Sequence, residues 1–440
     1  MIFSRTEVPV VRTRLLSELT KTIGTALADD RLERDSLLRP APTQTDERHL
    51  ARMTAASEIA KRRSVSDDAM SSTIFTESEE HGIIDEAIAR VLGLGRLETL
   101  LDDDEISDIH VRGSAPVWVK LRDGTRRECD PVVDSDEELV DLIRHAATRL
   151  GKTERRFDPA NPELNLQLPD GSRLFAAMEI SMRPTLIIRR HRFEFSSLKE
   201  LCSRDMMTTD VRSFLAAAVR ARRNIVIAGG TGSGKTTLLR ALINEIPRSE
   251  RLVTIEDAYE LGLDRFEHLH PDYDALQARP PNIEGRGEIT MADLTKMALR
   301  MDPDRVMVGE VRGAEAFPML MAMSQGNNGS MCTMHADSAR SVFPKLVAYV
   351  SMASMGIPAE TVNLLLASSV HFVVHIEVTD GSRCISSIRE VVDADGPTII
   401  SNEVFNRAHT ATAFAALRAP TIALLREHGF VDPERDTWSS

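Results

Sequence analysis

The spacing of apolar residues separates the second half of the chain from the first. From residue 211 onward, short apolar runs of strand length alternate with longer segments in which apolar residues recur every three or four positions. The first pattern is typical of buried strands and the second of helices. The predicted strands are residues 225–228, 252–255, 305–308 and 331–334, and the predicted helices are 236–246, 290–300 and 313–324. Strands that alternate with helices favour a parallel sheet with helices on its faces.

The last part of the chain continues this domain. An Asp380-Gly381 pair predicts a turn, residues 385–391 a strand, and residues 412–428 a closing helix. We therefore predict one α/β domain over residues 211–440, with a C-terminal subdomain that begins at about residue 379.

The patterns in the first half are shorter and less regular. The predicted elements are strands at 106–111, 117–121 and 186–188, helices at 83–101 and 137–150, and a hairpin turn at Pro169-Asp170-Gly171. They predict a smaller α+β domain over residues 76–195, followed by a linker at 196–210. Residues 1–75 are different again, since residues 28–72 are dense in Asp, Arg, Glu, Ser and Thr. Such a segment buries too little apolar area to fold, which predicts a largely flexible N-terminal extension.

Composition narrows the class of protein. The chain has 440 residues, and its formal net charge of −13 argues against a protein that coats nucleic acid, because that task needs a basic face. Its four cysteines form no Cys-x-x-Cys pair, so neither a zinc ribbon nor a disulfide framework is expected. The sequence contains no run of about 18 apolar residues, the length that a membrane-spanning helix needs. We expect a cytoplasmic protein, or one at the inner face of a membrane.

One motif identifies the class of ligand. The predicted strand at 225–228 is followed by Gly229-Gly230-Thr231-Gly232-Ser233-Gly234-Lys235-Thr236-Thr237, which matches the pattern Gly-x-x-x-x-Gly-Lys-Thr. Glycines let successive backbone N–H groups turn around a phosphate chain, and the following helix directs its positive end at the anion. Lys235 can reach the β- and γ-phosphates, and the Thr236 hydroxyl can bind Mg²⁺. The sequence therefore predicts a site for ATP and Mg²⁺.

Acidic residues follow two other predicted strands. Glu256 and Asp257 come after strand 252–255, and Glu310 comes after strand 305–308, behind Gly309. Carboxylates at the carboxyl edge of a parallel sheet can activate a water or hold a metal through water, although solvated loops also carry acids. His335 ends strand 331–334, where a γ-phosphate sensor and a structural histidine are equally compatible with the pattern.

Arginine supplies the positive charge that phosphoryl transfer needs. In the α/β domain the candidates are Arg279, Arg286, Arg300 and Arg312, and in the α+β domain they are Arg173 and Arg189.

Four ordered segments resemble the secretion ATPases of type II and type IV systems. They are Thr254-Ile255-Glu256-Asp257-Ala258-Tyr259-Glu260, Arg279-Pro280-Pro281-Asn282-Ile283-Glu284-Gly285, Val306-Met307-Val308-Gly309-Glu310-Val311-Arg312 and Gly329-Ser330-Met331-Cys332-Thr333-Met334-His335. The second segment resembles the Tad/Flp pilus assembly branch, the CpaF-like ATPases. The resemblance covers about residues 80–400. Relatives usually carry His and Asp where this chain has Asn327 and Asn328.

The resemblance implies a RecA-like ATPase domain preceded by a PAS-like α+β domain. It also implies Glu256 as general base, Glu310 as an atypical Walker B residue that supports Mg²⁺ through water, and His335 as γ-phosphate sensor. Arg173 and Arg189 of the α+β domain, with Arg279 and Arg300, would neutralise transition-state charge.

As partners, the resemblance implies further copies of the chain in a ring, as a hexamer, and an inner-membrane platform protein, with no specific nucleic acid. Three other classes stay open: a DNA-transfer ATPase of a conjugation-like system, a small-molecule P-loop kinase, and a scaffold that binds ATP without hydrolysing it.

Overall fold

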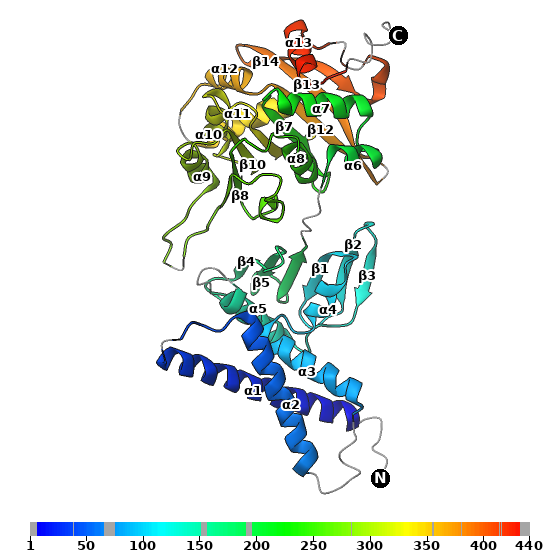
Figure 1. The fold of residues 1–440 in the computed structure, drawn as a ribbon, viewed down its shortest axis with the longest axis vertical. Coiled ribbons are helices and arrows are strands. Elements are labelled where there is room, and N and C mark those ends of the chain that lie inside the picture. Colours follow the sequence, from blue (N-terminus) through cyan, green and yellow to red (C-terminus); the bar gives the residue numbers. More distant parts are fainter. Residues whose placement is uncertain are drawn as a thin grey trace. The chain divides into compact units, whose positions relative to one another are not determined.

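The computed structural model describes residues 7–37, 39–65, 75–150, 156–190, 196–282, 284–353, 356–379, 381–412, 414 and 416–431. The chain divides into two compact units, Met1–His191 and Arg192–Ser440, and each is described by itself (Figure 1). Among the described residues, no helix is long and apolar enough to cross a lipid bilayer.

Three helices form the first part of the N-terminal unit. They are α1 (Glu7–Ser36), α2 (Gln44–Val65) and α3 (Glu77–Leu92). Leu19 and Ile23 of α1 are fully buried among Ala51, Ala55 and Ile83 of the other two helices. The prediction of a largely flexible extension over residues 1–75 is therefore corrected for the described part of that segment. The small residues of α2, which carry little apolar weight in a sequence pattern, allow α1 to approach closely.

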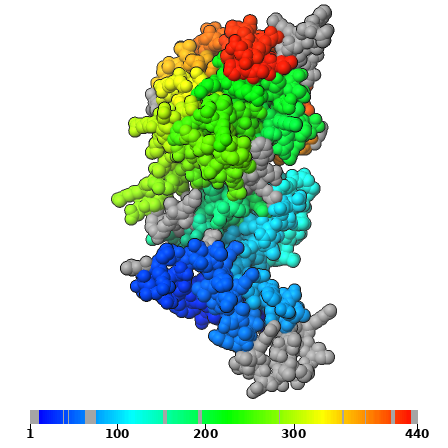
Figure 2. All heavy atoms as spheres, in the orientation of Figure 1, coloured from blue at the N-terminus to red at the C-terminus, as the bar shows by residue number. Residues whose placement is uncertain are grey.

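Salt bridges and a cap fix these helices in place. The Thr76 side chain caps α3 in a reciprocal capping box with Glu79. Glu47 of α2 is 6% exposed and accepts hydrogen bonds from Arg31 of α1 and from Arg149, which lies on helix α5 (Asp136–Leu150) of the same unit. In the space-filling view of Figure 2, the side chains of this segment are drawn in blue.

The α+β part of this unit is a six-stranded antiparallel sheet with the order β3-β2-β1-β6-β5-β4. Its elements are α4 (Leu97–Asp102), β1 (Ile106–Arg112), β2 (Val117–Leu121), β3 (Arg126–Cys129), α5 (Asp136–Leu150), β4 (Glu163–Gln167), β5 (Arg173–Ala177) and β6 (Thr185–Arg189). Alternate residues such as Ile109, Val119 and Ile188 are buried in one core. The predicted helix at 83–101 is divided between α3 and α4 by the Gly93–Gly95 break.

The second unit is built around an eight-stranded sheet with the order β14-β13-β12-β7-β11-β10-β8-β9. Its strands are β7 (Ile225–Gly229), β8 (Leu252–Glu256), β9 (Tyr273–Gln277), β10 (Arg305–Val311), β11 (Met331–His335), β12 (Phe372–Thr379), β13 (Ser382–Asp395) and β14 (Thr398–Asn406). The six strands from β12 to β9 pair in parallel, as predicted, whereas β13 and β14 add an antiparallel edge. Strands β9, β12 and β14 were not predicted.

Helices cover both faces of this sheet. They are α6 (Leu198–Ser203), α7 (Thr209–Arg220), α8 (Lys235–Ile243), α9 (Met291–Ala298), α10 (Ala316–Ser324), α11 (Val342–Met352), α12 (Ala359–Ser369) and α13 (Ala419–Glu427), with short 3-10 turns at Leu263–Arg265 and Arg407–Thr412. Strand β7 shows the two layers: Ile225 and Ile227 pack with α7 and α8, and Val226 and Ala228 pack with α10 to α12. The structure is the parallel α/β fold with helices on both faces that the alternating pattern predicted.

The segment predicted as a linker, 196–210, is part of this unit. Leu198, Leu201, Met206 and Met207 are buried in the core beneath α7 and α8. The Met206 carbonyl accepts a hydrogen bond from Ile385 N at 2.8 Å. The prediction of a linker is therefore wrong for these residues. The sequence did not indicate their burial, because the apolar side chains in this short polar segment are too few to give a periodic pattern.

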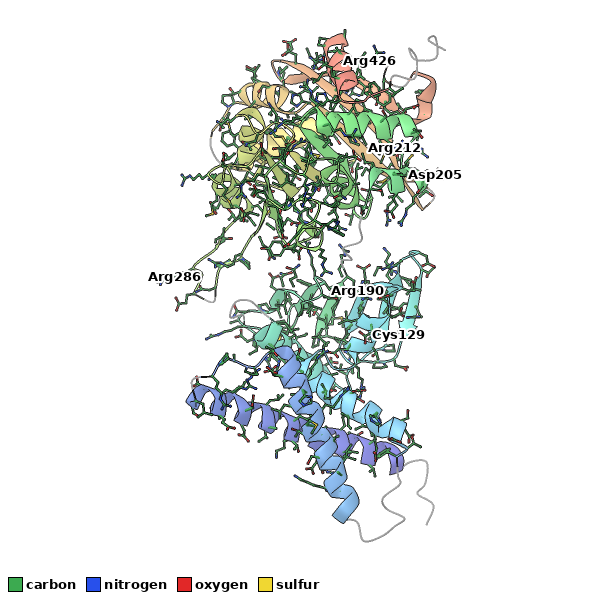
Figure 3. All side chains as sticks on the ribbon, viewed as in Figure 1. Cys129, Arg190, Asp205, Arg212, Arg286 and Arg426 are labelled. Carbon is green, nitrogen blue, oxygen red and sulfur yellow. The ribbon has the colours of Figure 1, made fainter. Side chains whose placement is uncertain are left out.

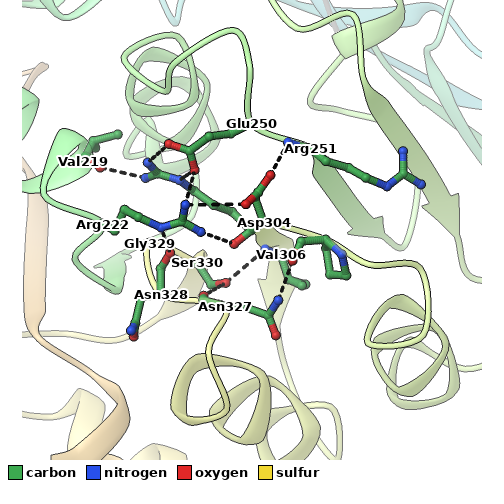
Figure 4. Close-up of polar contacts among 12 residues, drawn as sticks. Val219, Arg222, Glu250, Arg251, Asp304, Val306, Asn327, Asn328, Gly329 and Ser330 are labelled. Carbon is green, nitrogen blue, oxygen red and sulfur yellow. Dashed lines mark hydrogen bonds and ion pairs between the residues drawn. The ribbon is translucent and has the colours of Figure 1, made fainter.

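A buried ionic network closes the edge of the sheet where β7, β10 and β11 begin (Figure 4). Arg305 is fully buried, donates to both oxygens of Glu250 at 2.7 Å, and donates to the Val219 carbonyl at 2.7 Å. Arg222 adds an ion pair with Glu250 at 3.1 Å. Gly329 has a φ of +91°, and a Cβ there would lie 2.6 Å from Arg305 Nη1, so only glycine fits.

The loop that departs from the family pattern belongs to this network. Asn327 Nδ2 donates to the Pro303 carbonyl, and the Asn328 carbonyl accepts from Arg222. Because the loop precedes β11 while His335 ends it, the two lie at opposite ends of the strand. The difference from the family pattern at Asn327 and Asn328 therefore lies at the edge of the sheet where β11 begins, and not at the edge that carries His335.

Removing the carboxylate from this network should destabilise the second unit strongly. Glu250→Ala leaves the Arg305 guanidinium buried without its partner, which costs about 3 kcal/mol. Glu245→Ala is the matched control, because the Arg220–Glu245 pair is partly exposed and such pairs contribute less than about 1 kcal/mol. Urea unfolding followed by circular dichroism measures both; equal shifts of the two midpoints would contradict the role given to Glu250.

Candidate functional site

The phosphate loop connects β7 to α8 and has the backbone of an anion cradle. Gly232 and Gly234 have φ values of +72° and +95°, a region that favours glycine. At Gly229 a Cβ would lie 2.5 Å from the Ile376 carbonyl oxygen. Ser233 Oγ is buried and has no hydrogen-bond partner among the described residues. A loop of this shape, with polar groups turned inward at a helix N-terminus, fits a phosphate chain.

Lys235 is the first residue of α8, and its side chain folds back over the loop. Its Nζ donates to the Gly229 carbonyl at 3.1 Å and to the Gly230 carbonyl at 2.7 Å, and lies 3.4 Å from His335 Nδ1. The parallel register pairs His335 with Gly229, which explains how residues 100 positions apart meet. A phosphate group entering the loop would meet this ammonium directly.

His335 connects Lys235 to Glu310. Its Nε2 lies 2.8 Å from Glu310 Oε1 while its Nδ1 faces the lysine ammonium. An ammonium has only donors, so Nδ1 accepts and Nε2–H donates to the carboxylate. Burial and the nearby Lys235 charge lower the pKa of His335, opposed by Glu310, which agrees with a neutral ring. The pKa of Lys235 is also lowered by burial, and again Glu310 opposes the shift.

A bulge in β10 directs the Glu310 side chain. Val308 pairs with Cys332 and Val311 with Met334, so two residues of β10 lie opposite Thr333 alone. Bulges of this kind redirect a side chain and are frequent beside active sites. The other Glu310 oxygen accepts from Arg312 Nε at 2.6 Å, and Arg312 also approaches Asp257 at 3.6 Å.

Glu256 is turned into the protein. It is 2% exposed, and its Oε1 accepts from the backbone N–H groups of Glu260 and Leu261, both at 2.8 Å. Burial raises the pKa of Glu256 to about 7, opposed by these two hydrogen bonds. Gly309 makes room for it, because a Cβ at that position would lie 3.3 Å from Glu256 Cγ. This explains why glycine stands where most phosphate-loop enzymes have an aspartate.

Glu256 is fully enclosed, whereas Glu260 is half-buried. Its Oε2 lies 3.5 Å from Thr236 Oγ1, the hydroxyl expected to bind magnesium. The burial of Glu256 disfavours the role of general base that the resemblance implies, and its hydrogen bond to Glu260 N holds the backbone turn that brings Glu260 to Thr236. The sequence pattern could have suggested Glu260, because it lies in the same acidic segment.

The residues near the phosphate loop suit a Mg²⁺ ion that is held mainly by phosphate oxygens and water molecules. No group of three or more His, Cys, Asp and Glu residues in the described ranges forms a metal cage. Mg²⁺ in phosphate-loop sites needs only one or two protein ligands, because the phosphates and waters complete its octahedron. Thr236 would bind the ion directly, and Glu260 and Glu310 would act through its waters.

Three predicted arginines lie elsewhere in the second unit. Arg279 opens an extended loop after β9, bridged to Ile289, and its Nε donates to the Gly287 carbonyl at 2.9 Å. Arg286 is 82% exposed at the far end of this loop (Figures 1 and 3). Arg300 is exposed just after α9. Among the described contacts, none joins Arg279 or Arg300 to the phosphate loop of the same chain.

The remaining two arginines lie side by side in the first unit. Arg173 of β5 and Arg189 of β6 are directly paired across the antiparallel strands, so their side chains share one face of that sheet. Arg189 Nε donates to Asp108 Oδ1 at 3.0 Å. The strand register thus brings together two residues that the sequence indicated separately.

Comparison with known proteins finds a matching family model and similar proteins. The family model described as "Type II/IV secretion system protein" matches residues 91–416. A putative conjugal transfer protein of Mycobacterium tuberculosis is 34% identical over 69% of this chain and 86% of its own length. The type IV secretion system protein PtlH of Bordetella pertussis is 32% identical over 68% of this chain and 93% of its own.

Among solved structures, the crystal structure of the VirB11 ATPase from the Brucella suis type IV secretion system, in complex with sulphate, is 30% identical. The match covers 68% of this chain and 93% of that one, with a TM-score of 0.37, so the likeness rests on sequence. Since the family model spans well over half of the residues and includes the phosphate loop, Glu310 and His335, the chain belongs to the type II/IV secretion ATPase family.

Proposed function

We propose that this chain is the Mg²⁺-dependent ATP-hydrolysing motor of a Tad/Flp-type pilus assembly or secretion system. The observation that carries the proposal is the hydrogen-bonded series Lys235–His335–Glu310 at the mouth of the phosphate loop. It joins a phosphate-binding ammonium to a carboxylate through one neutral imidazole, so a γ-phosphate that draws Lys235 away changes the surroundings of Glu310. The Tad/Flp assignment is supported by the segment that begins at Arg279.

In this proposal each group has one task in phosphoryl transfer. Lys235 neutralises the β- and γ-phosphates, and Thr236 binds magnesium. Glu310 orients and activates the attacking water, and His335 reports the presence of the γ-phosphate. Glu256 positions Glu260, which supports the metal through water. Arg312 holds the Glu310 carboxylate in place by donating to it.

We further propose that the motor works as a ring, a hexamer, at the inner face of the cell membrane. Arg173 and Arg189 would approach the γ-phosphate when the α+β unit closes over the nucleotide, and Arg279 and Arg300 are further candidates to meet a nucleotide across subunits. Closure on ATP and release after hydrolysis would then move a membrane platform protein. The exposure of Arg279 and Arg300 favours a role between copies over one within a single chain.

A DNA-transfer ATPase is the second candidate, because one relative is named as a putative conjugal transfer protein. The net charge of −13 disfavours it, since DNA translocation needs a positively charged path.

The proposal predicts slow, Mg²⁺-dependent ATP hydrolysis by the purified full chain, together with hexamers that nucleotide promotes. Steady-state phosphate release and native mass are measured at the same protein concentration, with Lys235→Ala as the inactive control. Single- and double-stranded DNA are added in parallel assays. DNA-independent turnover supports the pilus motor, and strong stimulation by DNA would favour the conjugation-like function. Tight ATP binding by a monomer without turnover, even with membranes of its host added, would indicate a scaffold.

Replacing the proposed water-activating group should stop chemistry while ATP still binds. Glu310→Gln keeps a hydrogen bond to His335 but cannot accept a proton, so we expect kcat to fall by about 100-fold or more. Glu427→Gln, at an exposed position of α13, serves as the matched control. Single-turnover hydrolysis with a radiolabelled γ-phosphate measures the step; an unchanged rate for Glu310→Gln would remove Glu310 from catalysis.

The burial of Glu256 predicts a dependence of stability on pH. Its pKa is raised from 4.5 to about 7 in the folded chain, so the folded state holds the extra proton and stability falls as pH rises through this interval. Glu256→Gln keeps the acceptor oxygen without a charge. It should therefore gain stability relative to wild type between pH 5 and pH 8, by up to about 3 kcal/mol. Urea midpoints at both pH values test this, and a difference that does not change with pH would contradict it.

A further inference from the structure

An arginine that the sequence patterns did not indicate lies against the phosphate loop. Strand β12 runs parallel to β7, so its last residue, Thr379, ends at the same edge of the sheet as Gly229. The chain turns there, and β13 starts back with Ser382 and Arg383. A residue 151 positions after Gly232 is thereby brought beside it.

Arg383 contacts the backbone of the loop itself. Its Nε donates to the Gly232 carbonyl at 2.9 Å. A Cβ on Gly234 would lie 3.3 Å from both Arg383 Cδ and Met206 Cε. The Arg383 side chain and the buried Met206 therefore pack together against one side of the loop, and we call this pair the wall of the loop. The Met206 carbonyl also accepts the N–H of Ile385, which ties the wall to β13.

Arg383 lies on the opposite side of the loop from the catalytic carboxylate. In the sheet, β11 and β10 follow β7 on one side, and they carry His335 and Glu310. Strands β12 and β13 follow β7 on the other side. A triphosphate whose γ-group lies at Lys235 and His335 therefore has its nucleoside end toward Arg383.

The chemistry of this wall suits the phosphate nearest the nucleoside. A guanidinium carries five N–H donors in a planar fork, of which the Gly232 carbonyl uses the one on Nε. The two terminal nitrogens can bind phosphate oxygens in a bidentate manner. Met206 is 4% exposed, so it packs behind the fork as part of the core and supports the position of the arginine.

We propose that Arg383 binds the α-phosphate of the nucleotide and so determines affinity for ATP and ADP alike; this proposal rests on the proposed function, because it takes a nucleotide as the ligand. Arg383 anchors the nucleoside end while Lys235 anchors the γ end. The antiparallel addition of β13 to the parallel sheet thus supplies a ligand contact that the six parallel strands lack.

The test is the affinity of full-length Arg383→Ala for a series of ligands. We expect the Kd for ATP, ADP and inorganic triphosphate each to rise about tenfold, as the loss of one charge-assisted contact implies. Arg383→Lys should recover part of the loss, and KM for ATP should rise by a larger factor than kcat falls. Arg426→Ala, on the exposed side of α13, is the matched control and should bind like wild type (Figure 3).

Three results would overturn the proposal. Affinities of Arg383→Ala equal to those of wild type would show that the arginine does not touch the nucleotide. A loss for ATP and ADP but none for inorganic triphosphate would place Arg383 at the ribose or base instead of the phosphate. A loss for ATP alone would place it at the γ-phosphate. Wild-type protein that binds all three ligands but never hydrolyses ATP would contradict the proposed motor and leave the assignment of Arg383 standing.

Discussion

The parallel pairing of β10, β11 and β7 is the constraint on which the site depends. Because the three strands run in the same direction, their carboxyl ends meet at one edge, and the register places His335 next to Gly229. A reversal of any one strand would move its terminal residue to the other edge of the sheet. The buried Arg305–Glu250 network closes that other edge, where β7, β10 and β11 begin, and so holds the starting points of the strands that carry the chemistry.

At the edge of the sheet that carries the phosphate loop, a neutral histidine lies between two charged side chains. Lys235 and Glu310 carry opposite charges, yet they are joined through an imidazole that accepts on one side and donates on the other. An added phosphate competes for the lysine, which removes a positive neighbour from His335 and weakens the interaction that lowers its pKa. In the proposed function, the first response to phosphate at this site is therefore made by side-chain atoms of Lys235, His335 and Glu310.

The phosphate loop, the alternating sheet and the family could be predicted because each depends on a local pattern. The central strands are short apolar runs, and the glycines of the loop have a spacing that a phosphate requires. The packing of α1 and α2 could not be predicted, because their core pairs large residues of α1 with alanines of α2. The burial of Glu256 depends on the missing side chain of Gly309, a contact between neighbouring strands that no local pattern records. Arg383 was missed for the same kind of reason, since its position follows from the unpredicted strand β12.

The most direct test of this account is a structure of the full chain with Mg²⁺ and a non-hydrolysable ATP analogue. The account predicts that Lys235 Nζ leaves the Gly229 and Gly230 carbonyls for the β- and γ-phosphates, while His335 Nε2 still donates to Glu310 and Nδ1 faces the γ-phosphate. If Lys235 still lay on the two carbonyls and the phosphates bound elsewhere, the series from Lys235 to Glu310 would not be the element that responds to nucleotide, and the central claim would be wrong.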